Sequence, residues 1–173
     1  KYRMTRYADD FVIFARNKED IMKIPDILQP YLKERGLTLA LDKTRITNIH
    51  DGFDFLGFEF KRHKTRNGYK SLVKPSKASI NKFKKEIDRR FKLMNGNNVD
   101  TLIDFINPLI RGTANYWKPF ISSRIFSKMD NYIWKKTYKF LRRLHPHKSW
   151  NWIKRKYFPP YNDGRHKDKW VLT

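Results

Sequence analysis

Cysteine is absent from this 173-residue sequence. Disulfide bonds, thiolate zinc sites and a cysteine nucleophile are therefore excluded, which fits a reducing intracellular compartment. Long apolar runs are missing as well. The longest, such as residues 11–15, fall far short of the roughly 20 apolar residues that span a bilayer. No signal-peptide pattern is visible, and we expect no membrane partner.

Acidic residues are scarce relative to basic ones. The chain has 39 Lys and Arg against 17 Asp and Glu, a net charge of +22. An excess this large repels itself unless a polyanion neutralises it. Residues 61–98 hold thirteen basic and two acidic side chains, residues 134–170 hold twelve and two, and most carboxylates lie in the first sixty residues. This asymmetry predicts an N-terminal part that does chemistry with acids, followed by parts that bind a nucleic acid.

The first half of the chain shows strand patterns. Residues 4–14 alternate around Ala8-Asp9, which predicts a β-hairpin. Helical spacing over residues 21–32 contains two prolines, so this helix is expected either to kink or to begin late. We also expect strand or extended chain at residues 37–41 and 44–47, one strand over residues 53–60, and a hairpin turn at residues 66–69.

The second half is predicted to be helical. Ser76 or Ser79 caps a helix whose apolar seam is Ile80, Phe83, Ile87 and Phe91. An apolar stripe over residues 102–110 is interrupted by Pro108. A longer stripe over residues 126–144 ends at His145-Pro146, and a short helix follows at residues 149–157. Strands followed by helices indicate an α+β fold.

Two aspartates, Asp9 and Asp10, stand next to each other at the expected hairpin turn. Adjacent carboxylates are electrostatically unfavourable, because each raises the cost of ionising the other. A divalent-metal site accounts for such a pair, since Mg²⁺ binds carboxylate and phosphate oxygens. A solvated turn is the alternative, because Asp is common in turns. We favour the metal site because Tyr7 and apolar strands flank the pair.

The motif Tyr7-Ala8-Asp9-Asp10 resembles the hairpin signature of reverse transcriptases, in the form usual in group II intron enzymes. Further blocks resemble the same family in the same order. Residues 36–46 resemble the next family block, and residues 55–58 resemble the block that forms the primer grip. Four further segments resemble the maturase-specific region: residues 106–112 with 115–116, residues 126–130, residues 133–134 and residues 152–158. The resemblance covers the chain to about Phe158 and is carried by the series of blocks.

The resemblance implies roles for individual residues. Asp9 and Asp10 would hold the catalytic metal ions, Mg²⁺ or alternatively Mn²⁺. Lys43 would assist the departure of pyrophosphate, with a solvated surface lysine as the alternative. Tyr7 and Ala8 would lie beside the primer end and the incoming nucleotide. The primer backbone would be held by Phe55, Leu56 and Gly57.

Two helices carry basic side chains away from their apolar seams. Such a face suits the phosphates of an RNA or RNA–DNA duplex, or of folded intron RNA, although charge runs are usually solvated. Some aromatic residues could stack on bases, but at helical spacing most are expected in the core, and none is assigned to a site; they are Tyr116, Trp117, Trp134, Trp150 and Trp152. The candidate nucleic-acid-binding residues are Lys82, Lys85, Arg89, Lys92, Lys135, Lys136, Lys139, Arg142 and Arg143.

The implied protein is an RNA-directed DNA polymerase that also binds intron RNA. The expected fold is a partial palm β-sheet with a helix, at residues 1–74, followed by an all-helical thumb and maturase region at residues 75–158. A basic tail or linker, residues 159–173, completes the chain. The expected partners are an RNA template, a DNA primer, a deoxynucleoside triphosphate, intron RNA and the missing fingers and N-terminal palm. Without that segment and its further aspartate, we expect the chain alone not to polymerise DNA.

Two other functions stay open at this point. The protein could act mainly as an RNA-splicing maturase, with the polymerase role secondary or lost. It could also be a reverse transcriptase recruited to CRISPR spacer acquisition. The family implies the cytoplasm of a bacterium, or alternatively an organelle.

Overall fold

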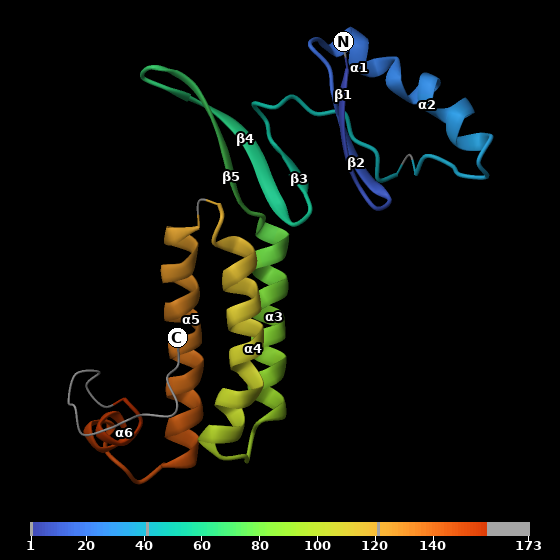
Figure 1. Ribbon diagram of the computed structural model, residues 1–173. Helices are drawn as coiled ribbons and strands as arrows, with labels where there is room; N and C mark the ends of the chain where they lie inside the picture. Colours follow the sequence, from blue (N-terminus) through green and yellow to red (C-terminus); the bar gives the residue numbers. More distant parts are fainter. Residues whose placement is uncertain (1, 41, 121, 159–173) are drawn as a thin grey trace. The chain divides into compact units, whose positions relative to one another are not determined.

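The computed structural model describes residues 2–40, 42–120 and 122–158. The order of its elements is strand-rich and then helical, as Figure 1 shows. The chain divides into two compact units. The first consists of Lys1–Leu56 and Phe60–Ser71, and the second of Gly57–Glu59 and Leu72–Thr173. The expected tail at residues 159–173 lies outside the described residues.

The first unit begins with the predicted hairpin. Strand β1 (Arg3–Tyr7) pairs antiparallel with β2 (Asp10–Phe14), and Tyr7 lies directly opposite Asp10. Two residues therefore form the turn, as expected. Helices α1 (Lys18–Met22) and α2 (Ile24–Lys33) follow the hairpin.

The prolines of the helical pattern explain its division into two helices. Pro25 stands in the first turn of α2, where a missing N–H is tolerated. The second expectation, a late start, is therefore correct for α2, although a separate short helix precedes it. Pro30 lies inside α2 and removes one backbone hydrogen bond there.

A three-stranded sheet of β3 (Phe53–Phe55), β4 (Phe58–Thr65) and β5 (Gly68–Pro75) follows, with the strands in that order. The turn between β4 and β5 falls where Asn-Gly predicted it. The single strand expected over residues 53–60 is wrong, because a turn at Leu56-Gly57 separates β3 from β4. The aromatic positions already indicate this break: Phe53 and Phe55 are odd-numbered, whereas Phe58 and Phe60 are even-numbered. Residues 37–41 and 44–47 were expected to be strand or extended chain, and their described residues form no strand.

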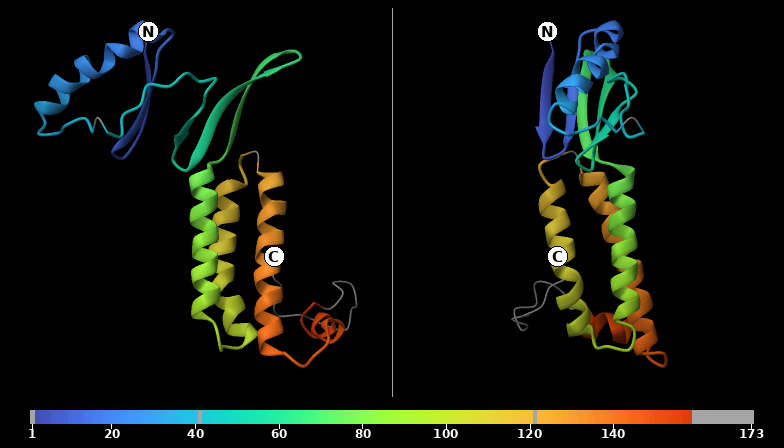
Figure 2. Two further views of the ribbon diagram at one scale, coloured as in Figure 1. Left: turned by 180° about the vertical axis from the view of Figure 1, so that it is seen from behind. Right: turned by 90° about the vertical axis from the view of Figure 1, so that its right-hand side faces the viewer.

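The second unit contains three long helices that lie side by side (Figures 1 and 2). They are α3 (Lys77–Leu93), α4 (Val99–Trp117) and α5 (Ser123–Leu144), and the short α6 (Trp150–Tyr157) follows. The expected helices therefore form, and the fold is α+β. Helix α4 continues through Pro108, so the expected interruption is wrong; the proline is exposed, and its ring points away from the core.

The core of this unit is built from the predicted apolar stripes. Ile87, Leu102, Ile106, Leu141 and Ile153 are almost completely buried. Edge-to-face aromatic contacts join the helices, Phe83 of α3 to Trp117 of α4 and Phe91 of α3 to Phe140 of α5. Such packing fixes α3 relative to its two neighbours, and so fixes which of its residues face solvent. In the described part of the chain, no helix is long and apolar enough to cross a bilayer.

Candidate active site and nucleic-acid interface

The aspartate pair lies at the tip of the β1–β2 hairpin. Asp9 is in the turn and Asp10 opens β2, and both side chains are exposed. Asp10 and Tyr7 are direct cross-strand partners, so their side chains share one face of the hairpin. Within the described residues, neither carboxylate has a hydrogen-bonding or ion-pair partner. Both remain available to a ligand.

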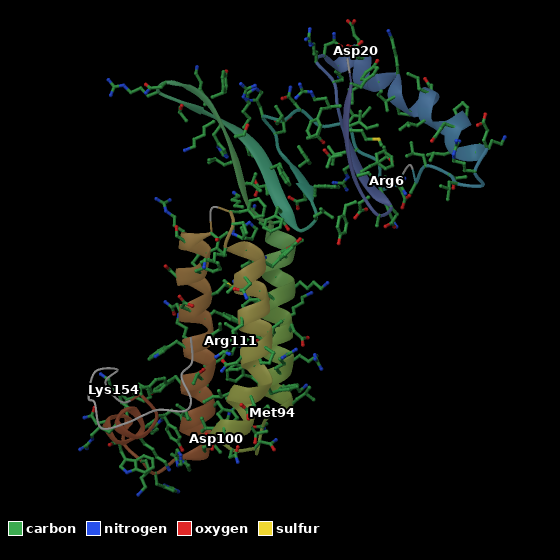
Figure 3. All side chains as sticks on the ribbon, viewed as in Figure 1. Arg6, Asp20, Met94, Asp100, Arg111 and Lys154 are labelled. Carbon is green, nitrogen blue, oxygen red and sulfur yellow. The ribbon has the colours of Figure 1, made fainter. Side chains whose placement is uncertain are left out.

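The backbone of this turn is strained at Ala8. Its φ is +52°, a left-handed conformation that few residues other than glycine adopt. The cost is about 1–3 kcal/mol, and strain of this kind clusters at functional sites. The Arg6 guanidinium supports the turn, since its Nε donates a hydrogen bond of 2.7 Å to the carbonyl oxygen of Ala8 (Figure 3).

The pair fits a magnesium ion in part. Carboxylate oxygens are the ligands that Mg²⁺ prefers, and Asp9 and Asp10 are adjacent and exposed. No group of three or more His, Cys, Asp or Glu side chains that could hold a metal occurs in the described part of the chain. A magnesium site built on this pair therefore needs further ligands, and the contribution of another palm aspartate stays a prediction.

Lys43 lies in a turn of the first unit. Its N–H and that of Thr44 both donate to the carbonyl oxygen of Ala40, at 3.1 and 3.0 Å. The Lys43 side chain is exposed, and no ion pair links it to Asp9 or Asp10 in the residues that the structure describes. Its proposed role beside the aspartates stays a prediction.

The expected primer-grip residues form the turn between β3 and β4. Leu56 and Gly57 have φ values of +48° and +77°, and two successive positive values are typical of the tight type I′ turn. Phe55, Leu56 and Gly57 are all half-buried. The three residues predicted as a group are therefore held together, in a turn instead of the expected strand.

This turn is anchored to the first turn of α3. The Ser76 N–H and the Ser79 hydroxyl both donate to the carbonyl oxygen of Gly57, each at 2.9 Å. Ser76 also caps α3, because its Oγ accepts from the Ser79 N–H at 3.1 Å. A Cβ at position 57 would lie 2.7 Å from the Ser79 Oγ, so only glycine fits without a shift. The β3–β4 turn is thus fixed directly to α3.

The four predicted cations of α3 form one row. Their spacing of three and four residues places Lys82, Lys85, Arg89 and Lys92 on a single helix face. All four are exposed, on the side opposite the buried Phe83, Ile87 and Phe91. We call this set the α3 basic row. It presents positive charge along more than two helical turns.

Arg89 differs from the other members because it already has an acidic partner. Its guanidinium donates two hydrogen bonds to Glu86, at 2.8 and 2.7 Å. Arg90 donates a third to Glu86, at 3.0 Å, and also contacts the carbonyl oxygen of Phe105 on α4. The hydrogen bonds from Arg89 and then Arg90 lower the pKa of Glu86 from 4.5 to about 2.

The five cations predicted on α5 are also not equivalent. Lys136 is half-buried, and its Nζ pairs with the Asp88 carboxylate of α3 at 2.6 Å. The Tyr132 hydroxyl donates to the same Asp88 oxygen, also at 2.6 Å. Burial raises the pKa of Asp88, but the bonds from Lys136 and Tyr132 outweigh it and lower this pKa. The members that are exposed are Lys135, Lys139, Arg142 and Arg143.

Two family profiles match the chain. The profile described as reverse transcriptase (RNA-dependent DNA polymerase) matches residues 1–60, and the one described as group II intron, maturase-specific domain, matches residues 80–158. Together they cover most of the chain, in the order in which the sequence blocks occur. The chain belongs to the group II intron reverse transcriptase/maturase family. The resemblance found in the sequence is therefore confirmed.

A curated relative in this comparison is Protein YkfC of Escherichia coli (strain K12). It is 38% identical to the chain over 73 residues, which are 39% of this chain and 18% of the relative. The chain therefore spans less than a fifth of the length of the relative that it matches.

The anchored turn lies inside the first match, near its end, and its partner Ser79 lies directly before the second. The reverse transcriptase match includes the aspartate pair and Gly57, and the maturase-specific match includes the basic residues of α3 from Lys82 onward. Ser79, which fixes Gly57 to α3, falls between the matches; the sequence indicated it only as a possible helix cap and not as a partner of Gly57. It lies 22 residues from Gly57, so no local pattern indicates the contact. The pairing of Glu86 with the arginines three and four residues later could have been found, since that spacing brings helical side chains together.

Proposed function

We propose that Asp9 and Asp10 are part of a two-metal nucleotidyl-transfer site that extends a DNA primer on an RNA template. The observation that carries the proposal is the exposed carboxylate pair at the tip of a strained hairpin, which has no partner among the described residues. Two magnesium ions would activate the primer hydroxyl and stabilise the leaving pyrophosphate. A complete palm would supply the further aspartate, and the deoxynucleoside triphosphate would bind there as the second substrate.

The chain's own residues would position the nucleic acid around this pair. Asp9 and Asp10 supply oxygen ligands, and the short Ala8 side chain leaves space beside them. The Tyr7 ring shares the face of Asp10 and offers an apolar surface to the primer end. The turn at Leu56-Gly57 presents backbone to the primer strand, where a side chain at position 57 would obstruct it. Lys43 would stabilise charge on the pyrophosphate.

Primer extension on an RNA template tests this proposal. The variant is Asp9→Asn, in a version of the protein that carries a complete palm, with Mg²⁺ and with Mn²⁺. We expect cDNA synthesis to fall by several orders of magnitude, because an amide does not replace a carboxylate as a ligand of these hard cations. RNA affinity should stay unchanged, since the basic helices are untouched.

Asp54→Asn is the matched control, because Asp54 is an exposed carboxylate of the same unit, on β3. It should leave both synthesis and RNA affinity as they are. Synthesis by the Asp9 variant at the unaltered rate would remove the proposed metal site. Equal loss of RNA affinity and synthesis would also contradict it, because the residue would then support the fold or the RNA contact instead of the chemistry.

The same protein is proposed to assist intron splicing by binding intron RNA. The maturase-specific match and the exposed α3 basic row favour this second role. Splicing of a cognate intron should therefore survive Asp9→Asn but weaken when Lys82, Lys85 and Lys92 are replaced together by Ala. A splicing assay in which the aspartate variant fails and the lysine variant succeeds would contradict the division of roles.

A further inference from the structure

Helices α5 and α6 share a cluster of four aromatic side chains. Trp134 and Tyr138 of α5 stack, with ring centroids 5.6 Å apart and an interplanar angle of 13°. Trp150 of α6 packs edge-on against both, at 6.1 and 4.8 Å. Phe158, at the end of α6, contacts Trp150 at 6.1 Å. We call these four residues the α5–α6 aromatic cluster.

Packing against Tyr138 and Trp150 covers only part of Trp134. Its side chain is 47% exposed, whereas the buried residues of α5, such as Ile133 and Phe140, face the neighbouring helices. The contact between Tyr138 and Trp150 already joins α6 to α5. An exposed indole ring loses the hydrophobic free energy that burial would provide. The part of the Trp134 ring that Tyr138 and Trp150 leave uncovered, among the described residues, therefore presents an aromatic surface to a ligand.

The surroundings of this cluster are mostly basic. Residues 131–158 contain nine Lys and Arg and no Asp or Glu. Trp134, Tyr138 and Arg142 follow one another at four-residue spacing, so the exposed Arg142 continues the aromatic stripe. Lys154, labelled in Figure 3, lies one turn after Trp150 on α6 and is also exposed. Exposed Asp130 lies one turn before Trp134 on α5, and the charged side chains after it, up to Phe158, are all cations. Aromatic rings beside such an excess of cations match a polyanion that also has flat apolar groups.

We propose that the α5–α6 aromatic cluster is a stacking platform for unpaired RNA bases, with Trp134 as the ring that receives the base. This inference rests on the proposed RNA-binding function and specifies one of its contacts. The bases of an A-form duplex are already paired and stacked, so only a loop, bulge or single strand can place a base on the indole. The flanking cations contact the phosphates on either side, as in other single-strand sites.

Binding of the 173-residue chain to two RNA probes tests the platform. One probe is a labelled oligouridylate of about 12 nucleotides, and the other is a blunt RNA duplex of equal length. Trp134→Leu removes the aromatic face, whereas Trp134→Phe keeps one. We expect the Leu variant to bind the single strand about 5- to 100-fold more weakly, the range expected for the loss of one stacked base. The Phe variant should keep most of the affinity, and both variants should bind the duplex as before.

Salt dependence separates stacking from charge. Trp134→Leu should weaken single-strand binding without changing the slope of log affinity against log salt. Lys139→Ala, on the neighbouring face of α5, should lower that slope by about 0.7 for one lost phosphate contact. As a measurement that needs no substitution, oligouridylate should quench tryptophan fluorescence in the unaltered chain, and this quenching should be much smaller for Trp134→Phe.

Several results would overturn the platform. Unchanged single-strand affinity of Trp134→Leu would do so, and so would an equal loss for the duplex, which has no base to stack. A dimeric wild type that becomes monomeric in the Leu variant, with unchanged RNA affinity, would assign the surface to a second copy of the chain. Failure of the unaltered chain to bind either RNA is a different outcome, since it would remove the proposed RNA-binding function itself.

Discussion

Replacing Gly57 by alanine tests the anchor between the β3–β4 turn and α3. Two effects should add. Alanine at a φ of +77° is strained, which costs about 1–2 kcal/mol. Its Cβ would also lie 2.7 Å from the Ser79 Oγ. The serine must rotate away, so its hydrogen bond to the Gly57 carbonyl is lost, at about 1 kcal/mol. We expect Gly57→Ala to destabilise the chain by about 2–3 kcal/mol.

A double-mutant cycle with Ser79→Ala separates these two effects. Ser79→Ala alone loses the same hydrogen bond, so it should cost about 1 kcal/mol. With the serine Oγ gone, the alanine at position 57 meets nothing closer than the Cβ of residue 79, at 3.9 Å. The hydrogen bond can be lost only once, so the double variant should be about 1 kcal/mol more stable than the sum of the single changes predicts.

Urea unfolding followed by tryptophan fluorescence measures all three variants. Gly96→Ala is the matched control, since Gly96 lies in the same unit with a φ of +90° and has no atom within 4 Å of an added Cβ. Gly96→Ala should lower the free energy of unfolding only by the backbone strain. In combination with Ser79→Ala, the two losses of stability should add. If Gly57→Ala and Ser79→Ala also add, within about 0.5 kcal/mol, the anchor does not exist as described.

Three further predictions concern the helical unit. Glu86→Gln should make the stability of the chain less dependent on acid. The folded-state pKa of Glu86 is about 2 against an ordinary 4.5, so the unaltered chain loses the stabilisation from the ionised carboxylate as pH falls from 4.5 towards 2. Urea unfolding at several pH values measures the difference. Ile106→Ala should cost about 2–5 kcal/mol, because Ile106 is fully buried, and thermal unfolding checks it. Asp88→Asn should lower stability by about 1 kcal/mol yet tighten RNA binding at low salt, since it frees Lys136; filter binding that shows weaker affinity would contradict this.

The helical half of the fold could be predicted because its signals are local. Ser76 caps α3 and Ser149 caps α6 through hydrogen bonds to residues three positions later. His145 and Pro146 end α5 where the apolar stripe stops. Each of these features depends on residues within one or two helical turns, and the apolar stripes that they delimit are wide enough to set the buried face.

The strand half was predicted less well for a physical reason. A strand is recognised by alternation alone, and the shift of the aromatics from odd to even positions at Leu56-Gly57 is a small signal beside four phenylalanines in eight residues. The chain from Leu37 to Thr47 has alternating apolar residues but finds no strand partner among the described residues. Pairing with a neighbour, which the sequence of the segment does not encode, decides whether such a segment becomes a strand.

The candidate aspartates could be found from the sequence, because a chemical motif is local, but the positions that support the site could not. Gly57 was selected for the close approach of the primer, and the structure gives it a second constraint, the Ser79 hydroxyl of α3. The two constraints act on the same missing side chain. If the turn contacts the primer as proposed, a substitution there would disturb both that contact and the attachment of the turn to α3, so loss of primer binding alone would not distinguish them.

The acidic residues of α3 reduce the number of cations that are available to RNA phosphates under the proposed function. Arg89 and Lys136 are counted among the cations, but Glu86 and Asp88 already neutralise them within the fold. A phosphate that contacts either one must displace a carboxylate or share its partner, so each contributes less affinity than an unpaired cation. Lys85 has no ion pair among the described residues and faces solvent, and it keeps its full charge for a phosphate. Under the proposed RNA-binding role, the charge that the bundle offers to phosphates is therefore smaller than its sequence implies, and it is concentrated on the exposed unpaired cations of α3 and α5.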